Sequence, residues 1–365
     1  MPKVRPIAIY LPQFHPIVEN DEWWGKGFTE WTNVTKAKPL FKGHYQPHLP
    51  TDLGFYDLRL SEVREEQAKL AKEYGIHGFC YYHYWFNGKR LMERPFQEVF
   101  ESGKPNFPFM LCWANENFTR AWDGLNKHIL LEQKYSEDDD RAHIRYLIPY
   151  FRDDRYIKID GKPVFCVYKS AAFPTMERTI QIWREEMRKE GLELYLCRFD
   201  RIESLGENLS GFDASVDFQP FSSTMFFYKK KLLLKRSIRI GLRRFFKLNK
   251  ISNAIAADKY DYEDYVNYAI SQPFPSYKIY PGITPSWDNS ARKPNNYMVF
   301  INSTPLLYKK WIDSILKKFK PYSEEENFIF INAWNEWAEG NHLEPCIKWG
   351  REYLEKTKEA LEENK

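Results

Sequence analysis

Paired cysteines are missing from this sequence, and so are long apolar runs. The 365 residues include five cysteines, Cys80, Cys112, Cys166, Cys197 and Cys346, and no two of them form a C-x-x-C pair. Four lie within apolar runs, which is typical of small buried side chains in a reducing compartment and not of a disulfide framework or a zinc site. No apolar run approaches the ~20 residues of a membrane span, and no signal peptide precedes Ile7. We therefore expect a cytoplasmic protein.

Acidic residues are absent from one block of the chain. Residues Lys229–Lys250 hold ten Lys and Arg and no acid, although the whole chain has 54 bases and 50 acids. The bases alternate with Leu, Ile and Phe, which predicts a basic amphipathic insertion at about residues 225–255. One hypothesis is peripheral contact with the anionic surface of the inner membrane, and the alternative is a helix packed on the protein body. We expect no nucleic-acid partner, because the remaining surface is acidic and no nucleic-acid-binding motif occurs.

Apolar runs alternate with helix-like segments along the whole chain. The runs are Val4–Tyr10, Gly78–Tyr82, Phe107–Ala114, Pro163–Tyr168, Leu192–Phe199, Ala214–Phe218, Lys278–Ile283 and Phe328–Trp334. Helical spacing with capping residues marks Leu58–Tyr74, Thr175–Glu190 and the segment from Pro305 to about Lys320. Eight strands alternating with helices predict a single α/β domain over residues 1–365, a (β/α)8 TIM barrel with long βα loops. An open doubly wound sheet is the alternative, but no G-x-G-x-x-G follows the first run.

The last apolar run leads directly into a polar, aromatic stretch. Glu336 and Glu339 follow Trp334 and are three residues apart, so a coiled segment would turn both towards one cleft. Two carboxyls at short range repel each other as anions, and one of them then keeps its proton near neutral pH. One acid and one base are what cleavage of a glycosidic bond requires. The alternative interpretation is a solvated turn with incidental glutamates.

Other loops that follow strands are also rich in aromatic and polar residues, and a barrel would gather them at one mouth. Aromatic residues make up 17% of the chain, and their faces suit sugar rings. Trp-Ala-Asn-Glu-Asn at 113–117 echoes Ala-Trp-Asn-Glu-Trp at 333–337. The predicted substrate-binding residues are Tyr10, Gln13, His15, Trp31, His48, Tyr82, His83, Trp85, Trp113, Asn115, Glu116, Trp287, Trp334, Asn335 and Trp337. We expect neither a metal nor a cofactor, because His15, His44, His48 and His83 lack the spacing of a known metal motif.

Several stretches resemble the WbsX-like family. They are Leu-Pro-Gln-Phe-His-Pro at 11–16, Trp-Trp-Gly-Lys-Gly-Phe-Thr-Glu-Trp at 23–31, Gly-His-Tyr-Gln-Pro-His-Leu-Pro at 43–50, Tyr-Tyr-His-Tyr-Trp-Phe at 81–86, Trp-Ala-Asn-Glu-Asn at 113–117 and Asn-Glu-Trp-Ala-Glu-Gly at 335–340. This family is related to glycoside hydrolase family 99, whose members are (β/α)8 barrels that cleave α-mannosidic linkages within a chain. WbsX-like proteins occur in gene clusters for bacterial surface polysaccharides, such as the lipopolysaccharide O-antigen, and are often labelled glycosyltransferases.

The resemblance implies roles for the two acids of the Asn-Glu-Trp-x-Glu motif. Glu339 would be the acid/base, and Glu336 would take the proton from the 2-hydroxyl of the substrate. The reaction would pass through a 1,2-anhydro sugar with net retention. One departure is Phe118, where the family pattern leads us to expect Trp; the position remains aromatic.

Three functions stay open at this point, all with an oligo- or polysaccharide as the partner. The first is a retaining glycosidase or transglycosylase acting on a bacterial surface glycan. The second is a glycosyltransferase that uses an activated sugar donor. Against it, the acids at Glu137–Asp140 are typical of a helix N-terminus and not of a diphosphate site. The third is a non-catalytic glycan-binding protein.

Overall fold

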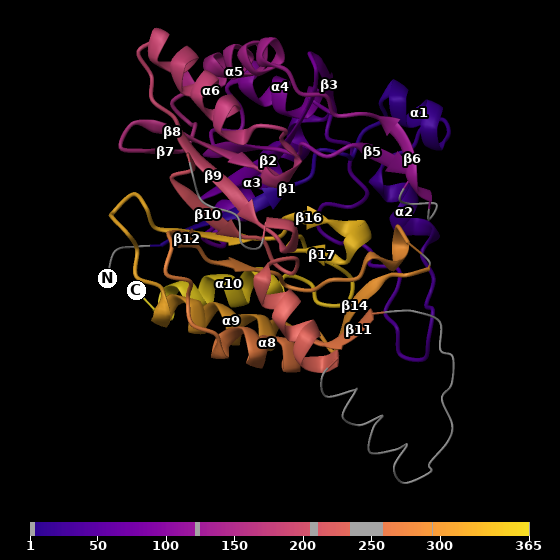
Figure 1. Ribbon diagram of the computed structural model, residues 1–365. Helices are drawn as coiled ribbons and strands as arrows, with labels where there is room; N and C mark the ends of the chain where they lie inside the picture. Colours follow the sequence, from indigo (N-terminus) through magenta and orange to yellow (C-terminus); the bar gives the residue numbers. More distant parts are fainter. Residues whose placement is uncertain (1–3, 121–124, 205–210, 234–257, 294, 365) are drawn as a thin grey trace.

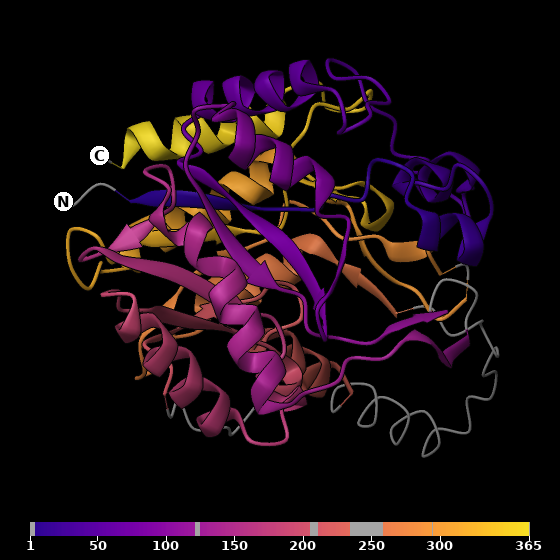
Figure 2. The same ribbon diagram turned by 90° about the horizontal axis from the view of Figure 1, so that it is seen from above.

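The computed structural model describes residues 4–120, 125–204, 211–233, 258–293 and 295–364. All eight predicted strands form, and they build one parallel sheet with helices outside it (Figures 1 and 2). The strands are β1 (Arg5–Tyr10), β2 (Gly78–Phe86), β4 (Phe109–Trp113), β8 (Lys162–Val167), β9 (Tyr195–Asp200), β10 (Ala214–Asp217), β12 (Ile279–Tyr280) with β13 (Gly282–Ile283), and β15 (Phe328–Ile331). The predicted α/β barrel is therefore confirmed.

The seventh strand closes the barrel by changing partners halfway along. Its first half, β12, pairs with β10, and its second half, β13, pairs with β15. Pro281 lies between the halves and has no N–H to donate, so the ladder breaks there. A Cβ at Gly282 would lie 1.6 Å from the carbonyl oxygen of Asp217, so only glycine fits where the strand crosses over. The apolar run predicts one continuous strand over Lys278–Ile283, and Pro281 divides it because it cannot donate to the ladder.

The main helices form the outer layer around the sheet. They are α3 (Ser61–Glu73), α4 (Arg94–Ser102), α5 (Glu137–Arg152), α6 (Met176–Lys189), α8 (Tyr262–Ser271), α9 (Pro305–Lys318) and α10 (Glu352–Glu363). The three predicted helices correspond to α3, α6 and α9; the start of α9 is as predicted and the other ends are shifted by one to three residues. Ser136 caps α5 by accepting the N–H of Asp139, which confirms that the acidic run at 137–140 begins a helix.

Smaller elements shape the loops. They are α1 (Val18–Trp24), α2 (Glu30–Lys36), β3 (Lys89–Leu91), β5 (Phe118–Arg120), β6 (Leu125–Leu131), β7 (Lys158–Ile159), β11 (Asp258–Asp261), β14 (Met298–Ile301), β16 (Asn335–Glu336), β17 (Asn341–His342), and the 3-10 helices η2 (Ser170–Ala172), η3 (Ile202–Ser204), η4 (Asn289–Ala291) and η5 (Trp337–Glu339). Residues 223–233 are also helical. Most of the predicted basic insertion, from residue 234 onward, lies outside the described residues.

The core fills the barrel and the space between sheet and helices. All five cysteines are free and buried, as the sequence predicted. Cys166 sits in register between Cys112 and Cys197 on the neighbouring strands. Their small side chains leave room for the large aromatic residues around them.

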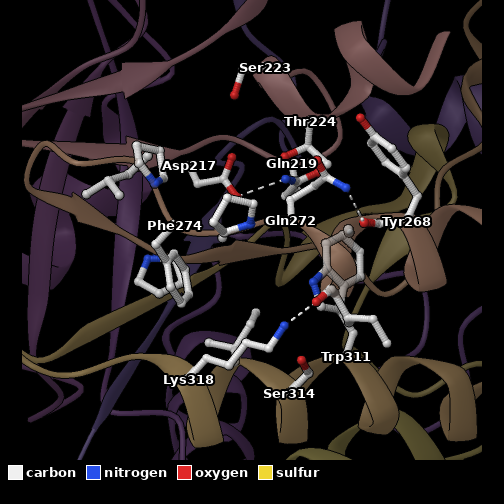
Figure 3. Close-up of a pocket in the computed structure, with 18 of the residues that line it drawn as sticks. Asp217, Gln219, Ser223, Thr224, Tyr268, Gln272, Phe274, Trp311, Ser314 and Lys318 are labelled. Carbon is white, nitrogen blue, oxygen red and sulfur yellow. Dashed lines mark hydrogen bonds between the residues drawn. The ribbon is translucent and has the colours of Figure 1, made fainter. Parts of the chain in front are cut away.

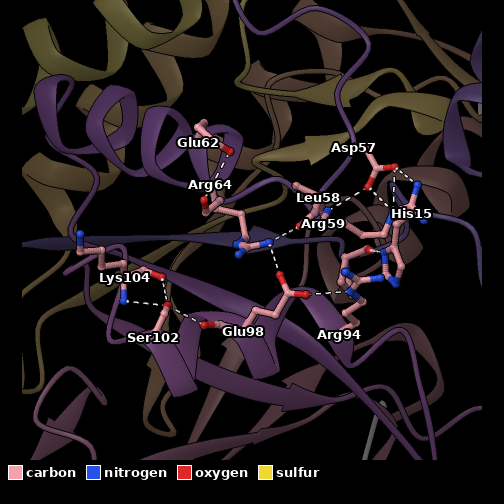
Figure 4. Close-up of polar contacts among 12 residues, drawn as sticks. His15, Asp57, Leu58, Arg59, Glu62, Arg64, Arg94, Glu98, Ser102 and Lys104 are labelled. Atoms are coloured by element: carbon pink, nitrogen blue, oxygen red, sulfur yellow. Dashed lines mark hydrogen bonds and ion pairs between the residues drawn. The ribbon is translucent and has the colours of Figure 1, made fainter.

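The long loop after β1 is anchored to the helical layer by buried polar contacts (Figure 4). Arg64 of α3 donates to the carbonyl of Leu58 at 2.5 Å and forms an ion pair with Glu98 of α4 at 2.9 Å. The N–H of Leu58 donates to the carbonyl of Phe14, near the other end of the loop. These bonds hold the loop against the barrel, so the residues it carries have fixed positions.

Across the described part of the chain, no helix is both long and apolar enough to cross a bilayer.

Candidate active site

A cavity of about 430 Å³ lies at the carboxyl ends of the barrel strands. Side chains from all eight strands, or from the loops that follow them, line it. They are Leu11, Gln13, Trp24, Tyr82, Tyr84, Ala114, Glu116, Asn117, Phe118, Thr119, Tyr168, Arg201, Glu203, Phe218, Phe221, Trp287, Asn289, Arg292, Lys293, Glu336 and Glu339. This end of a (β/α)8 barrel is where such folds place their active sites.

Glu336 and Glu339 enter the cavity from one tight turn. Strand β15 leads through β16 into the single turn of η5, which spans Trp337–Glu339. Gly340 follows with φ +55°, a left-handed conformation that suits glycine, and the chain then returns as β17 alongside β16. The coil in η5 brings the two carboxyls to the same cavity. Their side chains are 7% and 19% exposed, respectively.

A single arginine connects these acids with a third one. Nη2 of Arg292 donates to Glu336 at 2.7 Å, and Nη1 donates to Glu339 at 2.5 Å. Nε and Nη2 both donate to Oε1 of Glu30, at 2.8 and 2.5 Å. Glu30 begins α2 and is fully buried, so it anchors the guanidinium within the protein. One cation thus holds three carboxylates, which leaves the cluster acidic.

The buried charges of this cluster shift one another's pKa values. Burial raises the pKa of Glu336 to about 8, with Arg292 opposing the shift and the charges of Glu339 and Glu30 adding to it. Burial also raises the pKa of Glu339. Burial alone would lower the pKa of Arg292, but the three carboxylates hold it well above its usual value. The two acids therefore share one proton near neutral pH, beside a permanent cation.

A second layer of contacts holds the turn that carries Glu339. The backbone N–H of Asp288 donates to the carbonyl of Glu339 at 2.6 Å. The carboxylate of Asp288 in turn bonds His44 at 2.6 Å and Gln46 at 2.7 Å. On the other side of the turn, Glu344 accepts a bond from the indole N–H of Trp337 at 2.6 Å. The turn is therefore fixed through its backbone and through the one aromatic residue at its start.

Aromatic rings form one wall of the cavity. Tyr168, Phe218, Phe221 and Trp287 follow one another with ring centroids 5.2, 6.5 and 4.7 Å apart. The guanidinium of Arg201 lies over Tyr168 at 4.1 Å. Such a wall offers flat apolar faces against which the C–H faces of pyranose rings can pack.

The structure brings four of the predicted substrate-binding residues to the cavity together with the two acids. These four are Gln13, Tyr82, Glu116 and Trp287. Gln13 and Trp287 are almost completely buried, and Gln13 Nε2 and Trp287 Nε1 have no hydrogen-bond partner within the described residues. Buried donors of this kind usually have an acceptor, and a bound sugar hydroxyl would supply one.

The other predicted substrate-binding residues lie outside the cavity lining and contact protein groups. Tyr10 bonds Gln67, Trp85 bonds Asp139, Trp31 bonds the carbonyl of Tyr56, Trp113 bonds the carbonyl of Trp85, Trp337 bonds Glu344, and Trp334 is fully buried. Asn115 and Asn335 bond the backbone of neighbouring loops. Aromatic side chains at a strand end can pack inward as easily as outward, and the sequence does not distinguish the two.

The four predicted histidines do not all converge: His44 and His48 line one hollow, whereas His15 and His83 are not part of it. His15 contacts the carbonyl of Pro12, His44 contacts Asp288, His48 contacts His342 at 3.2 Å, and His83 contacts His143 at 2.9 Å. Over the described ranges, no group of three His, Cys, Asp or Glu side chains is arranged to hold a metal ion.

Sequence reasoning missed Glu30 and Arg292, which complete the acidic cluster, and also Tyr84, Tyr168 and Arg201 of the cavity. Glu30 lies in the aromatic stretch at 23–31, and that unusual context was the only signal for it. Arg292 follows Trp287 by five residues in a loop that was already expected at the mouth. Its partners are 44, 47 and 262 residues away, so no local pattern points to it.

A closed (β/α)8 barrel with paired acids and an aromatic wall at its mouth is the class of protein that the fold and the site define. The comparison with protein families adds the family. The chain belongs to the family described as glycosyltransferase WbsX, whose model matches residues 6–357.

Two similar proteins come from Xanthomonas campestris pv. campestris. They are the uncharacterized proteins WxcX of strain B100 and of strain ATCC 33913, each 39% identical over 357 residues. The match covers 97% of this chain and 49% of each relative, so the chain spans about half the length of these relatives.

Solved structures resemble the chain over its full length. A GH99 endo-α-mannosidase from Bacteroides thetaiotaomicron has a TM-score of 0.58 at 13% identity and covers 99% of this chain and 97% of its own. A glycoside hydrolase-like protein has a TM-score of 0.61, also at 13% identity, with 99% and 94% covered. At this identity the likeness shows a shared fold.

Proposed function

We propose that this chain is a retaining glycosidase or transglycosylase acting on a bacterial surface glycan. The observation that carries the proposal is the placing of Glu336 and Glu339 on one turn, in one cavity, bonded to one guanidinium. The family and the fold indicate a glycan-processing enzyme. The finer assignment to glycosidic bond cleavage rests on the chemistry that two unequal carboxyls can perform.

In the first step, Glu336 takes the proton from the 2-hydroxyl of the sugar. The freed oxygen attacks the anomeric carbon and forms a 1,2-anhydro sugar, while the bond from that carbon to the leaving oxygen breaks. Glu339 gives its proton to the leaving oxygen. Arg292 stays bonded to the cluster and offsets the negative charge that passes from one carboxyl to the other.

In the second step, Glu339 takes a proton from water or from a sugar hydroxyl. The oxygen of that group attacks the anomeric carbon, the bond to the 2-oxygen breaks, and Glu336 returns the proton to that oxygen. Two inversions at one carbon give net retention. Water as the attacking group gives hydrolysis, and a hydroxyl gives transfer.

These roles set a condition on the proton that the acids share. The mechanism needs Glu336 ionised and Glu339 protonated, whereas burial in the free protein raises the pKa of both carboxyls, that of Glu336 to about 8, so the proton is not confined to Glu339. Glu339 is the more exposed of the two. A sugar seated on the turn would bury Glu339 further, and its 2-hydroxyl would donate to Glu336. Both effects move the proton towards Glu339.

The substrate we favour is an α-mannoside-like segment within an oligosaccharide. Three features support it: the aromatic wall, the buried unpaired donors of Gln13 and Trp287, and the similarity to GH99 endo-α-mannosidases. The wall spans several rings, which suits a chain of sugars better than one sugar.

Nuclear magnetic resonance of the products tests the reaction. Incubation with mannose-type oligosaccharides in D₂O should release a sugar whose anomeric configuration at first matches that of the substrate. Glu336→Gln and Glu339→Gln should abolish the release while circular dichroism spectra stay unchanged. An initially inverted product would rule out the two-step route, and turnover in either variant would rule out the assigned residue.

A glycosyltransferase that uses an activated sugar donor is the second candidate. The description of the family favours it, and so do two cations of the cavity, Arg201 and Lys293, which could face a diphosphate. Calorimetry with nucleotide sugars separates the candidates. Binding that Arg201→Gln weakens would favour the transferase, and heats indistinguishable from dilution would favour the glycosidase.

A further inference from the structure

We propose that one flank of the barrel binds the surface of an anionic phospholipid membrane. This flank consists of the helical residues 223–233, α8, residues 272–275 and α9, and we call it the lysine flank. Helices α8 and α9 run side by side below the sheet in Figure 1. The proposal goes beyond the glycan chemistry of the cavity and does not depend on it.

Large apolar side chains are exposed on the lysine flank. Phe226, Phe227, Leu233, Phe274 and Leu306 are between 39% and 67% exposed. Scattered apolar residues are normal on any protein surface. Five of them on one flank form a patch of the kind that marks an interaction site.

Three of these side chains, Phe227, Phe274 and Leu306, border connected hollows and therefore share one face, and the ring of Phe226 packs against that of Phe227. A hollow of about 280 Å³ opens between the three helical elements, and Phe227, Phe274 and Lys318 are among the residues that line it (Figure 3). A second hollow of about 440 Å³ follows α9 and is lined in part by Leu306. Ile270 and Lys318 line both hollows, so Phe227, Phe274 and Leu306 lie along one continuous surface.

Lysines surround the apolar groups. The helical residues 223–233, α8 and α9 contain seven lysines and three acids, whereas bases and acids are nearly balanced in the whole chain. One of the three acids, Asp313, is paired with Lys309 at 3.0 Å, and the other two are Glu263 and Asp264. The exposed lysines are Lys230, Lys231, Lys310, Lys317 and Lys318. Apolar side chains framed by lysines can insert at the boundary of the lipid headgroups, while the lysines attract anionic lipids.

The sign of the charge decides between a membrane and a second copy of the chain. A symmetric dimer would place the lysine flank against itself and bring lysines against lysines. An anionic membrane surface satisfies the cations and the apolar groups at the same time. The acid-free sequence block also continues from this flank, although its residues beyond 233 lie outside the described part of the chain.

Flotation of the whole protein with lipid vesicles tests the proposal. We expect wild-type protein to float with phosphatidylcholine vesicles that contain phosphatidylglycerol, to remain unbound with phosphatidylcholine alone, and to be released by high salt. Lys230→Glu with Lys231→Glu should lower the partition coefficient by roughly a hundredfold. Phe226→Ser with Phe227→Ser should lower it by about tenfold and leave its salt dependence unchanged.

Lys69→Glu with Lys72→Glu on α3 is the matched control, because it changes the net charge equally on another face. This control should float like wild type, and circular dichroism should confirm that every variant is folded. Wild-type protein that fails to float, or a control that binds as weakly as the Lys230 and Lys231 variant, would overturn the proposal. Dimers detected by light scattering without vesicles, and lost in the Phe226 and Phe227 variant, would assign the flank to a second copy instead.

Discussion

Two Asn-Glu pairs follow two strands of this barrel, and their asparagines make equivalent hydrogen bonds. Asn115, after β4, accepts the N–H of Lys169 at 2.8 Å and donates to its carbonyl at 2.9 Å. Asn335, after β15, accepts the N–H of Leu11 at 2.7 Å and donates to its carbonyl at 3.0 Å. In both places a fully buried amide pairs with the backbone just beyond the neighbouring strand. Each asparagine side chain therefore continues the hydrogen bonding of the sheet beyond the end of the strand.

The glutamates that follow these asparagines differ sharply. The Glu116 side chain is 38% exposed and lies 3.1 Å from Lys169 and 3.8 Å from Arg201. The Glu336 side chain is 7% exposed, and the cation it contacts, Arg292, also contacts two more acids. Solvent reaches the Glu116 side chain, whereas Glu336 lies within a cluster of mutually bonded charged groups. The same local motif therefore gives a partly exposed carboxyl in one place and a buried, proton-sharing carboxyl in the other.

The largest expected effect on activity comes from replacing the glutamates with glutamine, and it should differ between the two motifs. We expect Glu336→Gln and Glu339→Gln to lower kcat/KM by about 10³-fold or more, because each removes a group that moves a proton. Glu116→Gln is the matched control, since it makes the same change in the twin motif, and it should cost less than about tenfold, mainly through KM. Steady-state kinetics on a mannose-type oligosaccharide measure all three. A loss of kcat/KM in Glu116→Gln equal to that in Glu336→Gln would show that the different burial of the two glutamates does not give them different roles.

The next largest effect is a shift in the pH profile of kcat/KM, with opposite signs in variants of Arg292 and of Glu30. Arg292 lowers the pKa of Glu336 and Glu30 raises it. Because the proposed reaction needs Glu336 ionised, Arg292→Met should move the acidic limb of the pH profile of kcat/KM to higher pH, and Glu30→Gln should move it to lower pH. We also expect about a hundredfold loss of activity in Arg292→Met, with Arg292→Lys recovering part of it. Shifts of the same sign in both variants would mean that the cluster acts only as a scaffold.

The sequence predicts the barrel well because the signals for its strands and helices are local. Each strand is an apolar run of a few residues, and helices such as α9 carry their own caps. The break in the seventh strand at Pro281 could have been predicted, since proline cannot continue a hydrogen-bonded ladder. The strand-like residues on both sides nevertheless favour one continuous strand.

The candidate site is only partly predictable for a different reason. Glu336 and Glu339 are found because they share one short stretch, and Trp287 because it follows a strand. Glu30 and Arg292 form a pair across 262 residues, and a single charged residue in a loop carries no periodic signal. Trp113 and Trp334 follow the expected pattern for the mouth but are fully buried in the core. Which way a side chain turns at a strand end depends on packing between distant segments.

The shared role of the two asparagines predicts equal effects on stability. Asn115→Ala and Asn335→Ala each remove three side-chain hydrogen bonds, one to a tyrosine hydroxyl and two to the backbone, and leave a backbone N–H and a backbone carbonyl without these partners. We expect each change to lower the free energy of unfolding by about 2–3 kcal/mol, measured by urea denaturation. Only Asn335→Ala should also lower kcat, because it loosens the turn that carries the paired acids. A difference above about 1 kcal/mol between the two would contradict their equivalence.

The smallest expected effect concerns Glu344, an acid of the same stretch that contacts neutral donors instead of a cation. It accepts bonds from Trp337 at 2.6 Å, Gln67 at 2.6 Å and Tyr56 at 2.9 Å. Burial raises its pKa from 4.5 to about 7, so the folded state binds this proton more tightly than the unfolded chain does. Its contribution to stability is therefore full below pH 4.5 and is lost as the pH rises through about 7, with a slope of at most about 1.4 kcal/mol per pH unit. Glu344→Gln cannot titrate, so its free energy of unfolding should decline less between pH 5 and pH 7 than that of wild type, whatever constant offset the altered bonds introduce. Parallel curves for the two proteins, obtained by urea denaturation at each pH, would show that Glu344 is ionised throughout and that its neutral donors offset the cost of burying its charge.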